Sequence, residues 1–195
     1  MIRFDGKSEV EKGHVLYELM PLNNSITFFQ GAIFQGDRLS EAIKLKNDHS
    51  FDLVKLEEEF FIFALDRAVY YLKMIKDSPE LVDILNQIDI EIGSSAIKDT
   101  RDMRTHVDSY IYKDKKKKGG RKQEKFYITP IDAPASFKIK PSIDATSSIM
   151  VGDWYLIGGR VDFYKTISLL KKLFPAIKAI CQIKKMELLN AHRTK

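Results

Sequence analysis

The chain has 195 residues, 44% of them hydrophobic, a length and composition that exclude a disordered polypeptide and predict one domain with a substantial core. The formal net charge of +5 comes from 32 basic and 27 acidic residues, so local clustering of charge matters more than its total. Cys181 is the single cysteine, which excludes an internal disulfide and a site built from several thiolates of one chain.

The start of the sequence contains no apolar run of signal-peptide length. The most apolar segment, FFIFALDRAVYYL, is interrupted by Asp66 and Arg67 long before it could span a bilayer. We therefore expect a cytoplasmic protein that does not contact the membrane, and a single cysteine fits a reducing compartment.

Helical periodicity dominates the first part of the chain. The segment Ser8–Met20 predicts a helix that ends at Pro21. Ser25–Lys46 predicts one or two further helices, with Gly31 and Gly36 as possible breaks. Apolar residues then recur at helical spacing without Gly or Pro, so residues 52–76 are predicted to form a long amphipathic helix.

Two shorter helices are expected to follow. Ser78 and Pro79 have the character of an N-cap and a first helical residue, which predicts a helix running toward Glu91. Gly93 interrupts this segment, and the next helix is expected from about Ser95 to Tyr112. These elements complete a helical region over residues 1–112.

The second part of the chain changes character. Residues 113–125 are predicted to form a flexible basic loop, because like charges resist compaction and two glycines break any helix. Alternating apolar residues and three prolines predict a small antiparallel β meander over residues 126–159. Helical periodicity returns over residues 160–195, where Pro175 is expected to kink or divide the helix. The predicted fold class is mainly α: a single-domain helical bundle with a small antiparallel β meander inserted before the last helix.

Several common kinds of site are absent from the sequence. It contains neither of the usual glycine-rich phosphate-binding loops nor a G-x-S-x-G nucleophile motif. No two of the four histidines have the i, i+4 spacing of a helical zinc site. We therefore predict no metal and no cofactor.

One cluster, R-D-x-x-x-H, combines residues that can cut RNA. On a helix Asp102, His106 and Tyr110 share one face, and Arg101 can reach over that face. A histidine can take a proton from a 2′-hydroxyl or give one to the leaving oxygen. An arginine can hold the phosphate and offset the charge of the transition state, and Asp102 can orient the imidazole. Arg101, His106 and Asp102 are the predicted catalytic residues.

The segment Arg101–His106, RDMRTH, resembles the R-x4-6-H motif of the HEPN superfamily. The resemblance implies a small helical bundle in which the Arg and His come late. Many members are metal-independent ribonucleases of toxin-antitoxin, abortive-infection and CRISPR-associated defence systems. It also implies a homodimer, because two copies meet to form one composite site, and an antitoxin or effector as a further partner.

A basic run begins within two turns of His106 and would extend a phosphate-binding surface in a salt-sensitive, sequence-independent manner. The predicted RNA-binding residues are Arg104, Tyr110, Lys115, Lys116, Lys117, Lys118, Arg121 and Lys122.

Other interpretations remain open. The pairs Lys98–Asp102 and Arg104–Asp108 also suit a solvated, salt-bridged helix face, and the lysine run also suits a soluble loop tip. The whole chain can accordingly be a noncatalytic RNA- or nucleotide-binding module, or a scaffold that uses its apolar helix faces.

The aromatic residues allow two interpretations as well. Trp154 and Tyr155 either stack on bases or anchor the meander on the bundle. The group Phe60, Phe61 and Phe63 belongs to the core, or forms a dimer face if part of it is exposed.

Overall fold

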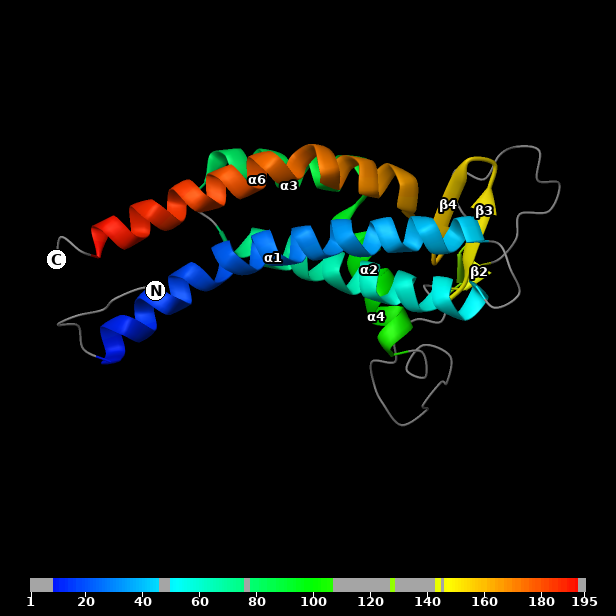
Figure 1. Ribbon diagram of the computed structural model, residues 1–195, viewed down its shortest axis with the longest axis horizontal. Coiled ribbons are helices and arrows are strands. Elements are labelled where there is room, and N and C mark those ends of the chain that lie inside the picture. The colour runs from blue at the N-terminus through cyan, green and yellow to red at the C-terminus, as the bar shows by residue number, and fades with distance from the viewer. Residues whose placement is uncertain are drawn as a thin grey trace.

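The computed structural model describes residues 9–45, 50–75, 78–106, 127–128, 143–144 and 146–192. Within these ranges the chain forms five helices and a three-stranded antiparallel sheet that precedes the last helix, together with a two-stranded ladder. The predicted fold class is therefore confirmed. None of the described helices is both long and apolar enough to cross a membrane. Figure 1 shows the longest helices lying side by side, with the sheet at one end of the bundle.

The first helix, α1 (Glu9–Leu45), is one continuous element of 37 residues. The predictions that it stops at Pro21 and that a glycine breaks it were wrong. A proline inside a helix removes one hydrogen bond and costs about 3 kcal/mol. Here buried residues lie on both sides of Pro21, including Leu19 and Phe29, and their burial offsets that local cost because each large apolar side chain contributes about 1.5–3 kcal/mol.

Helix α2 (Ser50–Met74) closely matches the predicted helix over residues 52–76 and runs back along α1 (Figure 1). Helix α3 (Pro79–Glu91) follows with Ser78 as its extended N-cap. The Ser78 hydroxyl donates to Glu80 Oε2 at 2.8 Å, so the cap side chain binds the first turn through a carboxylate. Gly93 has φ of 81° and separates α3 from α4 (Ser94–Thr105), because the positive φ suits a residue without Cβ.

The predicted meander is present as strands β3 (Ser148–Val151), β4 (Trp154–Ile157) and β5 (Val161–Asp162), in the order β3-β4-β5. The register pairs Val151 with Trp154, so β3 and β4 are joined by a two-residue turn at Gly152, whose φ is 58°. Strands β1 (Tyr127–Ile128) and β2 (Ile143–Asp144) form the separate antiparallel ladder. The β3-β4-β5 sheet lies at one end of the bundle (Figure 1), where Tyr155 of β4 bonds to Glu58 of α2.

The last helix, α6 (Phe163–Ala191), has 29 residues and packs on α1 and α3 (Figure 1). The Asp162 side chain caps it by accepting from the Lys165 backbone N–H at 3.2 Å. Pro175 lies inside the helix without dividing it. Gly36 of α1 provides the close approach to this helix, because a Cβ at that position would lie 3.0 Å from Ile167 Cγ1.

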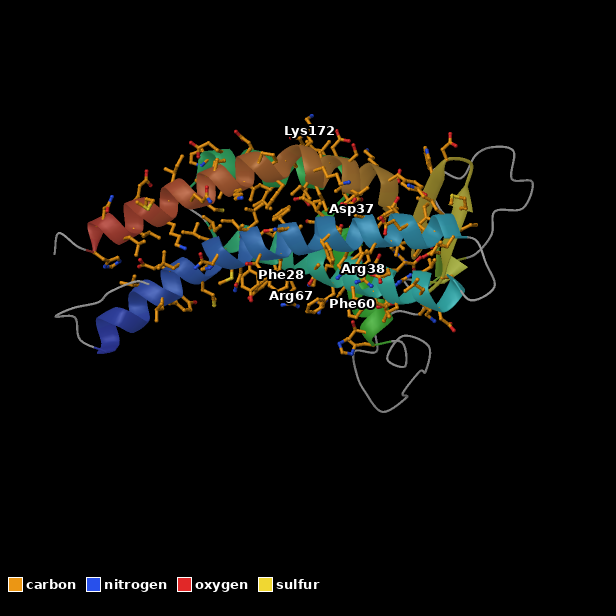
Figure 2. All side chains as sticks on the ribbon, in the orientation of Figure 1. Phe28, Asp37, Arg38, Phe60, Arg67 and Lys172 are labelled. Atoms are coloured by element: carbon orange, nitrogen blue, oxygen red, sulfur yellow. The ribbon has the colours of Figure 1, made fainter. Side chains whose placement is uncertain are left out.

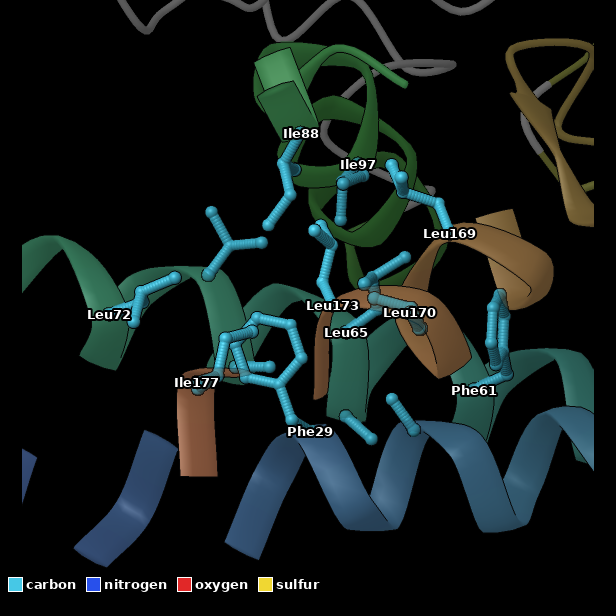
Figure 3. Close-up of a cluster of buried hydrophobic side chains, with 14 of the residues drawn as sticks. Phe29, Phe61, Leu65, Leu72, Ile88, Ile97, Leu169, Leu170, Leu173 and Ile177 are labelled. Atoms are coloured by element: carbon cyan, nitrogen blue, oxygen red, sulfur yellow. The ribbon is translucent and has the colours of Figure 1, made fainter. Parts of the chain in front are cut away.

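One hydrophobic core joins these helices (Figure 3). Its side chains come from α1, α2, α3, α4 and α6, and from strands β4 and β5. The members labelled in Figure 3 are Phe29, Phe61, Leu65, Leu72, Ile88, Ile97, Leu169, Leu170, Leu173 and Ile177. Because every described helix contributes, removing α4 or α6 would expose apolar surface on the others.

Candidate functional site

Arg101 lies on α4 with its side chain 22% exposed and held by two carboxylates. Its Nη2 is 2.8 Å from Asp102 Oδ1, and its Nε is 3.5 Å from Asp66 Oδ2 on α2. Asp102 therefore pairs with Arg101 rather than with Lys98, the partner that helical spacing predicted. The two acids fix the guanidinium at the edge of the α2–α4 contact, where part of it still reaches the surface.

His106 ends α4. Its φ and ψ of −125° and 43° are not helical, although its backbone N–H still donates to the Asp102 carbonyl at 3.0 Å. The side chain is exposed. The described helix thus stops at Thr105, earlier than the predicted end at Tyr112, and the remaining predicted residues lie outside the described ranges. The imidazole is therefore in contact with solvent at the end of α4, and its predicted catalytic role stays a prediction. The predicted role of Asp102 in orienting it stays a prediction.

Arg104 does not lie where an RNA contact requires it. Its side chain is 1% exposed and forms ion pairs with Glu58 and Glu59 of α2, at 2.8 and 3.0 Å. A guanidinium enclosed in this way cannot reach a phosphate backbone without breaking a buried charge pair, which costs about 3–5 kcal/mol. The prediction that Arg104 binds RNA is therefore corrected: Arg104 belongs to the interior.

The spacing of buried residues on α4 contained the signal for this burial. Ile97, Thr100, Met103 and Arg104 are all buried and recur at three- and four-residue spacing, so Arg104 lies on the inward face. The sequence interpretation placed Arg104 by its charge instead. The other predicted RNA-binding residues, Tyr110, Lys115, Lys116, Lys117, Lys118, Arg121 and Lys122, lie outside the described ranges.

A second basic residue, Arg67 of α2, lies close to Arg101 and is not among the predicted site residues. Its Nη2 is 3.5 Å from Asp66 Oδ2, the same oxygen that contacts Arg101. Its guanidinium carbon lies 5.7 Å from the Phe63 ring centroid and 5.4 Å from that of Tyr70. Phe63, Arg67 and Tyr70 recur at helical spacing, which is the sequence signal that could have found this group.

These residues belong to a longer surface, which we call the α2 stripe. It consists of Leu53, Leu56, Phe60, Phe63, Arg67 and Tyr70, which recur alternately three and four residues apart. Its five apolar members are between 38% and 50% exposed. Figure 2 labels Phe60 and Arg67 on this outer side of the α1–α2 pair. Strict alternation of this kind is the pattern of a coiled-coil seam, which ordinarily packs against another helix.

The structure distinguishes the aromatic alternatives for Tyr155 and for the phenylalanines of α2. Phe61 is fully buried, whereas Phe60 and Phe63 are about half exposed. Tyr155 is buried and packs edge-to-face on Phe163 of α6, so it anchors the sheet on the bundle. Trp154 is 40% exposed at the start of β4. Phe61 is therefore core, whereas Phe60 and Phe63 are not, and for these two the alternative of a dimer face stays a prediction.

A groove of about 940 Å³ lies at the end of the bundle away from the sheet. It is lined by the first half of α1, the end of α2 and the end of α6, with Tyr17, Tyr70 and Leu188 among its walls. Neither Arg101 nor His106 lines it. Among the described side chains no three His, Cys, Asp or Glu residues come together as a metal-binding group.

Comparison of the chain with protein-family models, with curated proteins and with solved structures found no match. The fold and the site define a mainly helical bundle with a small antiparallel sheet and an arginine and a histidine near the end of one helix. The HEPN resemblance consequently rests on the motif at residues 101–106 and on its place after a long helical region.

Proposed function

We propose that this chain is a metal-independent endoribonuclease of the HEPN type, acting in the cytoplasm as a toxin or defence effector. The observation that carries the proposal is the placement of Arg101 and His106 at the end of α4, where His106 is exposed and Arg101 is partly exposed. An accessible histidine five residues after a fixed arginine provides proton transfer and phosphate binding on one short segment.

His106 acts as general base and then as general acid in this proposal. The imidazole takes the proton of a 2′-hydroxyl while that oxygen attacks the adjacent phosphorus. The bond from phosphorus to the 5′-oxygen breaks, and the leaving 5′-oxygen receives a proton from an imidazolium. The products are a 2′,3′-cyclic phosphate and a free 5′-hydroxyl, so atoms and charge balance without a co-reactant.

Arg101 holds the phosphate during this step. A guanidinium has five N–H donors, and the two carboxylate contacts of Arg101 leave donors for a phosphate oxygen. Asp66 and Asp102 keep the side chain in place before the substrate binds, which lowers the entropy cost of binding. Positive charge at the phosphate is most useful in the transition state, where the phosphoryl oxygens carry extra negative charge.

A second copy of the chain is the proposed partner that completes the site. The α2 stripe supports this, because its apolar members have coiled-coil spacing and remain exposed in one copy. The α2 stripe extends in the sequence on both sides of Asp66, and Asp66 contacts Arg101. Packing of the stripes of two copies would therefore bring the two Arg101–His106 sites near each other. An antitoxin or a larger effector, the other predicted partner, remains part of the proposal for how the activity is controlled.

A noncatalytic RNA-binding module is the second candidate, favoured by one observation. Arg101 is already paired with Asp102 and contacts Asp66, so its charge is largely neutralised before any RNA arrives. In that case the chain binds RNA in a salt-dependent manner and cuts nothing.

Cleavage of an unstructured fluorescent RNA in EDTA tests the proposal. We expect wild-type protein to cut, His106→Ala to lose about 10²–10⁴-fold in rate, and Arg101→Ala about 10²–10³-fold. His192→Ala is the matched control, because His192 is also the C-cap of a helix but pairs with Glu18 in another part of the bundle. Its rate should equal that of wild type.

Two results would contradict the proposal. Unchanged cleavage by folded His106→Ala removes this histidine from the mechanism. Absence of cleavage by every protein, with RNA binding that weakens as salt rises, establishes the binding module instead. Circular dichroism of each variant shows that loss of activity is not loss of folding.

A further inference from the structure

Arg104 is the centre of a buried polar network that joins α2, α4 and the sheet. Its Nη2 donates to Glu58 Oε2 at 2.8 Å and to Ser148 Oγ at 3.1 Å, and its Nη1 donates to Glu59 Oε1 at 3.0 Å. The Tyr155 hydroxyl on β4 donates to the other oxygen of Glu58. One arginine therefore connects two glutamates of α2 to strand β3, and Glu58 connects it further to β4.

This network requires an arginine and a fixed geometry. Removing a charge from water costs several kcal/mol, which is regained only when its hydrogen bonds are satisfied in good geometry. The planar guanidinium directs its donors toward several acceptors at once, whereas a lysine ammonium cannot reproduce that fork. A contrasting pair lies next to it: Arg38 binds the buried Glu57, but the Arg38 side chain is 51% exposed. The Arg104 side chain is only 1% exposed, so it cannot leave Glu58 for solvent as Arg38 can leave Glu57.

The network lies directly beside the proposed site. Arg104 is the last residue but one of α4, three positions after Arg101 and two before His106. Its partners on α2 and on the sheet hold the final turn of α4 from two directions. Because α4 ends at Thr105, the orientation of its last turn determines the orientation of His106, the next residue.

We propose that Arg104 and Tyr155 are positioning residues, and that the sheet holds the last turn of α4 so that His106 faces the substrate. The inference rests on the proposed ribonuclease function. Tyr155 fixes the Glu58 carboxylate, Glu58 fixes Arg104, and Arg104 sets the final turn. None of the three contacts RNA. The β meander is thus a structural part of the site rather than an addition to the bundle.

Tyr155→Phe is the primary variant, because it keeps the ring against Phe163 and removes the hydroxyl alone. Tyr164→Phe is the matched control, because the Tyr164 ring also contacts Phe163, with centroids 5.1 Å apart, but lies on α6. Two quantities are measured for each protein: amide hydrogen exchange of α3 and α4, and the kcat and KM of RNA cleavage.

In Tyr155→Phe we expect exchange in the last turn of α4 to accelerate about tenfold, the effect of one lost hydrogen bond to a charged group, with α3 unchanged. The kcat should fall by a similar factor while KM stays constant, because RNA binding is not touched. Arg104→Lys, which keeps the charge and loses the fork, should show the same pattern more strongly. Tyr164→Phe should behave as wild type.

Equal exchange in wild type and Tyr155→Phe would overturn the proposal, as would acceleration spread evenly over α3 and α4, which indicates general destabilisation. A rise in KM with constant kcat would overturn it too, because it indicates a binding role. If wild-type protein cuts no RNA, the proposed function fails, and the exchange comparison still decides whether the network holds the last turn of α4.

Discussion

The contact between α1 and α6 at Gly36 allows a quantitative prediction. A Cβ added there would lie 3.0 Å from Ile167 Cγ1, nearer still to Ile167 Cδ1, and 3.2 Å from Phe61 Cε2. Gly31, five residues earlier on the same helix, has nothing within 4 Å of an added Cβ. The two glycines therefore share a helix and differ in the space above them, so Gly31→Ala is the matched control for Gly36→Ala.

Two free-energy contributions determine the result. Replacing a mid-helix glycine by alanine stabilises a helix by about 0.5–1 kcal/mol. Gly31→Ala should therefore raise the free energy of unfolding by about that amount. At Gly36 the same gain is opposed by overpacking, which costs about 1–3 kcal/mol when neighbours must shift. We expect Gly36→Ala to be less stable than wild type, by about 0.5–2 kcal/mol.

Urea unfolding followed by circular dichroism, at one fixed protein concentration, measures both variants. A double variant identifies the cause. Ile167→Val removes Cδ1, the atom nearest to the added Cβ, so Gly36→Ala should cost less in the Ile167→Val background than in wild type. If Gly36→Ala is as stable as Gly31→Ala, or if the two sites show no coupling, the close approach of α1 and α6 is not as described.

Three further predictions concern other parts of the bundle. Burial raises the pKa of the Cys181 thiol to about 11, so at pH 8 a thiol reagent should label native protein at least tenfold more slowly than unfolded protein; equal rates would place the thiol at the surface. Hydrogen bonding from the Ser94 side chain lowers the pKa of Asp89, whose carboxylate also accepts from the Ser94 backbone N–H at 3.0 Å. A lowered pKa stabilises the fold above the unfolded value of about 4, and this effect is lost as the pH falls through the folded value. Asp89 is exposed, so solvent screening keeps the effect small, and Asp89→Ala should cost about 0.2–0.5 kcal/mol at pH 7 and less at pH 3 in thermal unfolding; a pH-independent cost would contradict the assignment. In sedimentation, Phe63→Asp should weaken self-association about 30-fold. Ile90→Asp on α3 is the control, because Ile90 is 83% exposed and lies outside the α2 stripe, and it should leave self-association unchanged. Equal effects of the two variants would show that the α2 stripe is not the interface.

Local signals in the sequence located most elements because those signals act over a few residues. The apolar spacing that predicted residues 52–76 describes α2, and Ser78 with Pro79 marks the start of α3. Gly93 separates two helices through its positive φ, which its own lack of a side chain permits. In each case the physical cause lies within one or two turns of the residue, so no knowledge of the packing was needed.

The errors occurred where distant residues decide the outcome. Pro21 should end a helix in isolation, yet α1 continues because apolar residues on both sides of it are buried by other helices. Arg104 has the charge typical of a surface residue, but its partners Glu58, Glu59 and Ser148 lie 44 to 46 positions away in the chain. The tolerance of α1 for Pro21 is not encoded in the neighbours of that proline. For Arg104 the neighbours give only the spacing of the inward face of α4, and its charge partners come from other elements.

The sequence by itself determined the fold class, the placement of the meander before the last helix, and the motif in which Arg101 and His106 are five residues apart. Helical periodicity, turn residues and motif spacing are local properties, and they were sufficient for these conclusions. Only the tertiary structure decided that Asp102 and Asp66 hold Arg101, that Arg104 is internal, and that Phe60 and Phe63 face outward. These are properties of how α2, α4 and the sheet pack together, because burial depends on which faces of different elements meet in space.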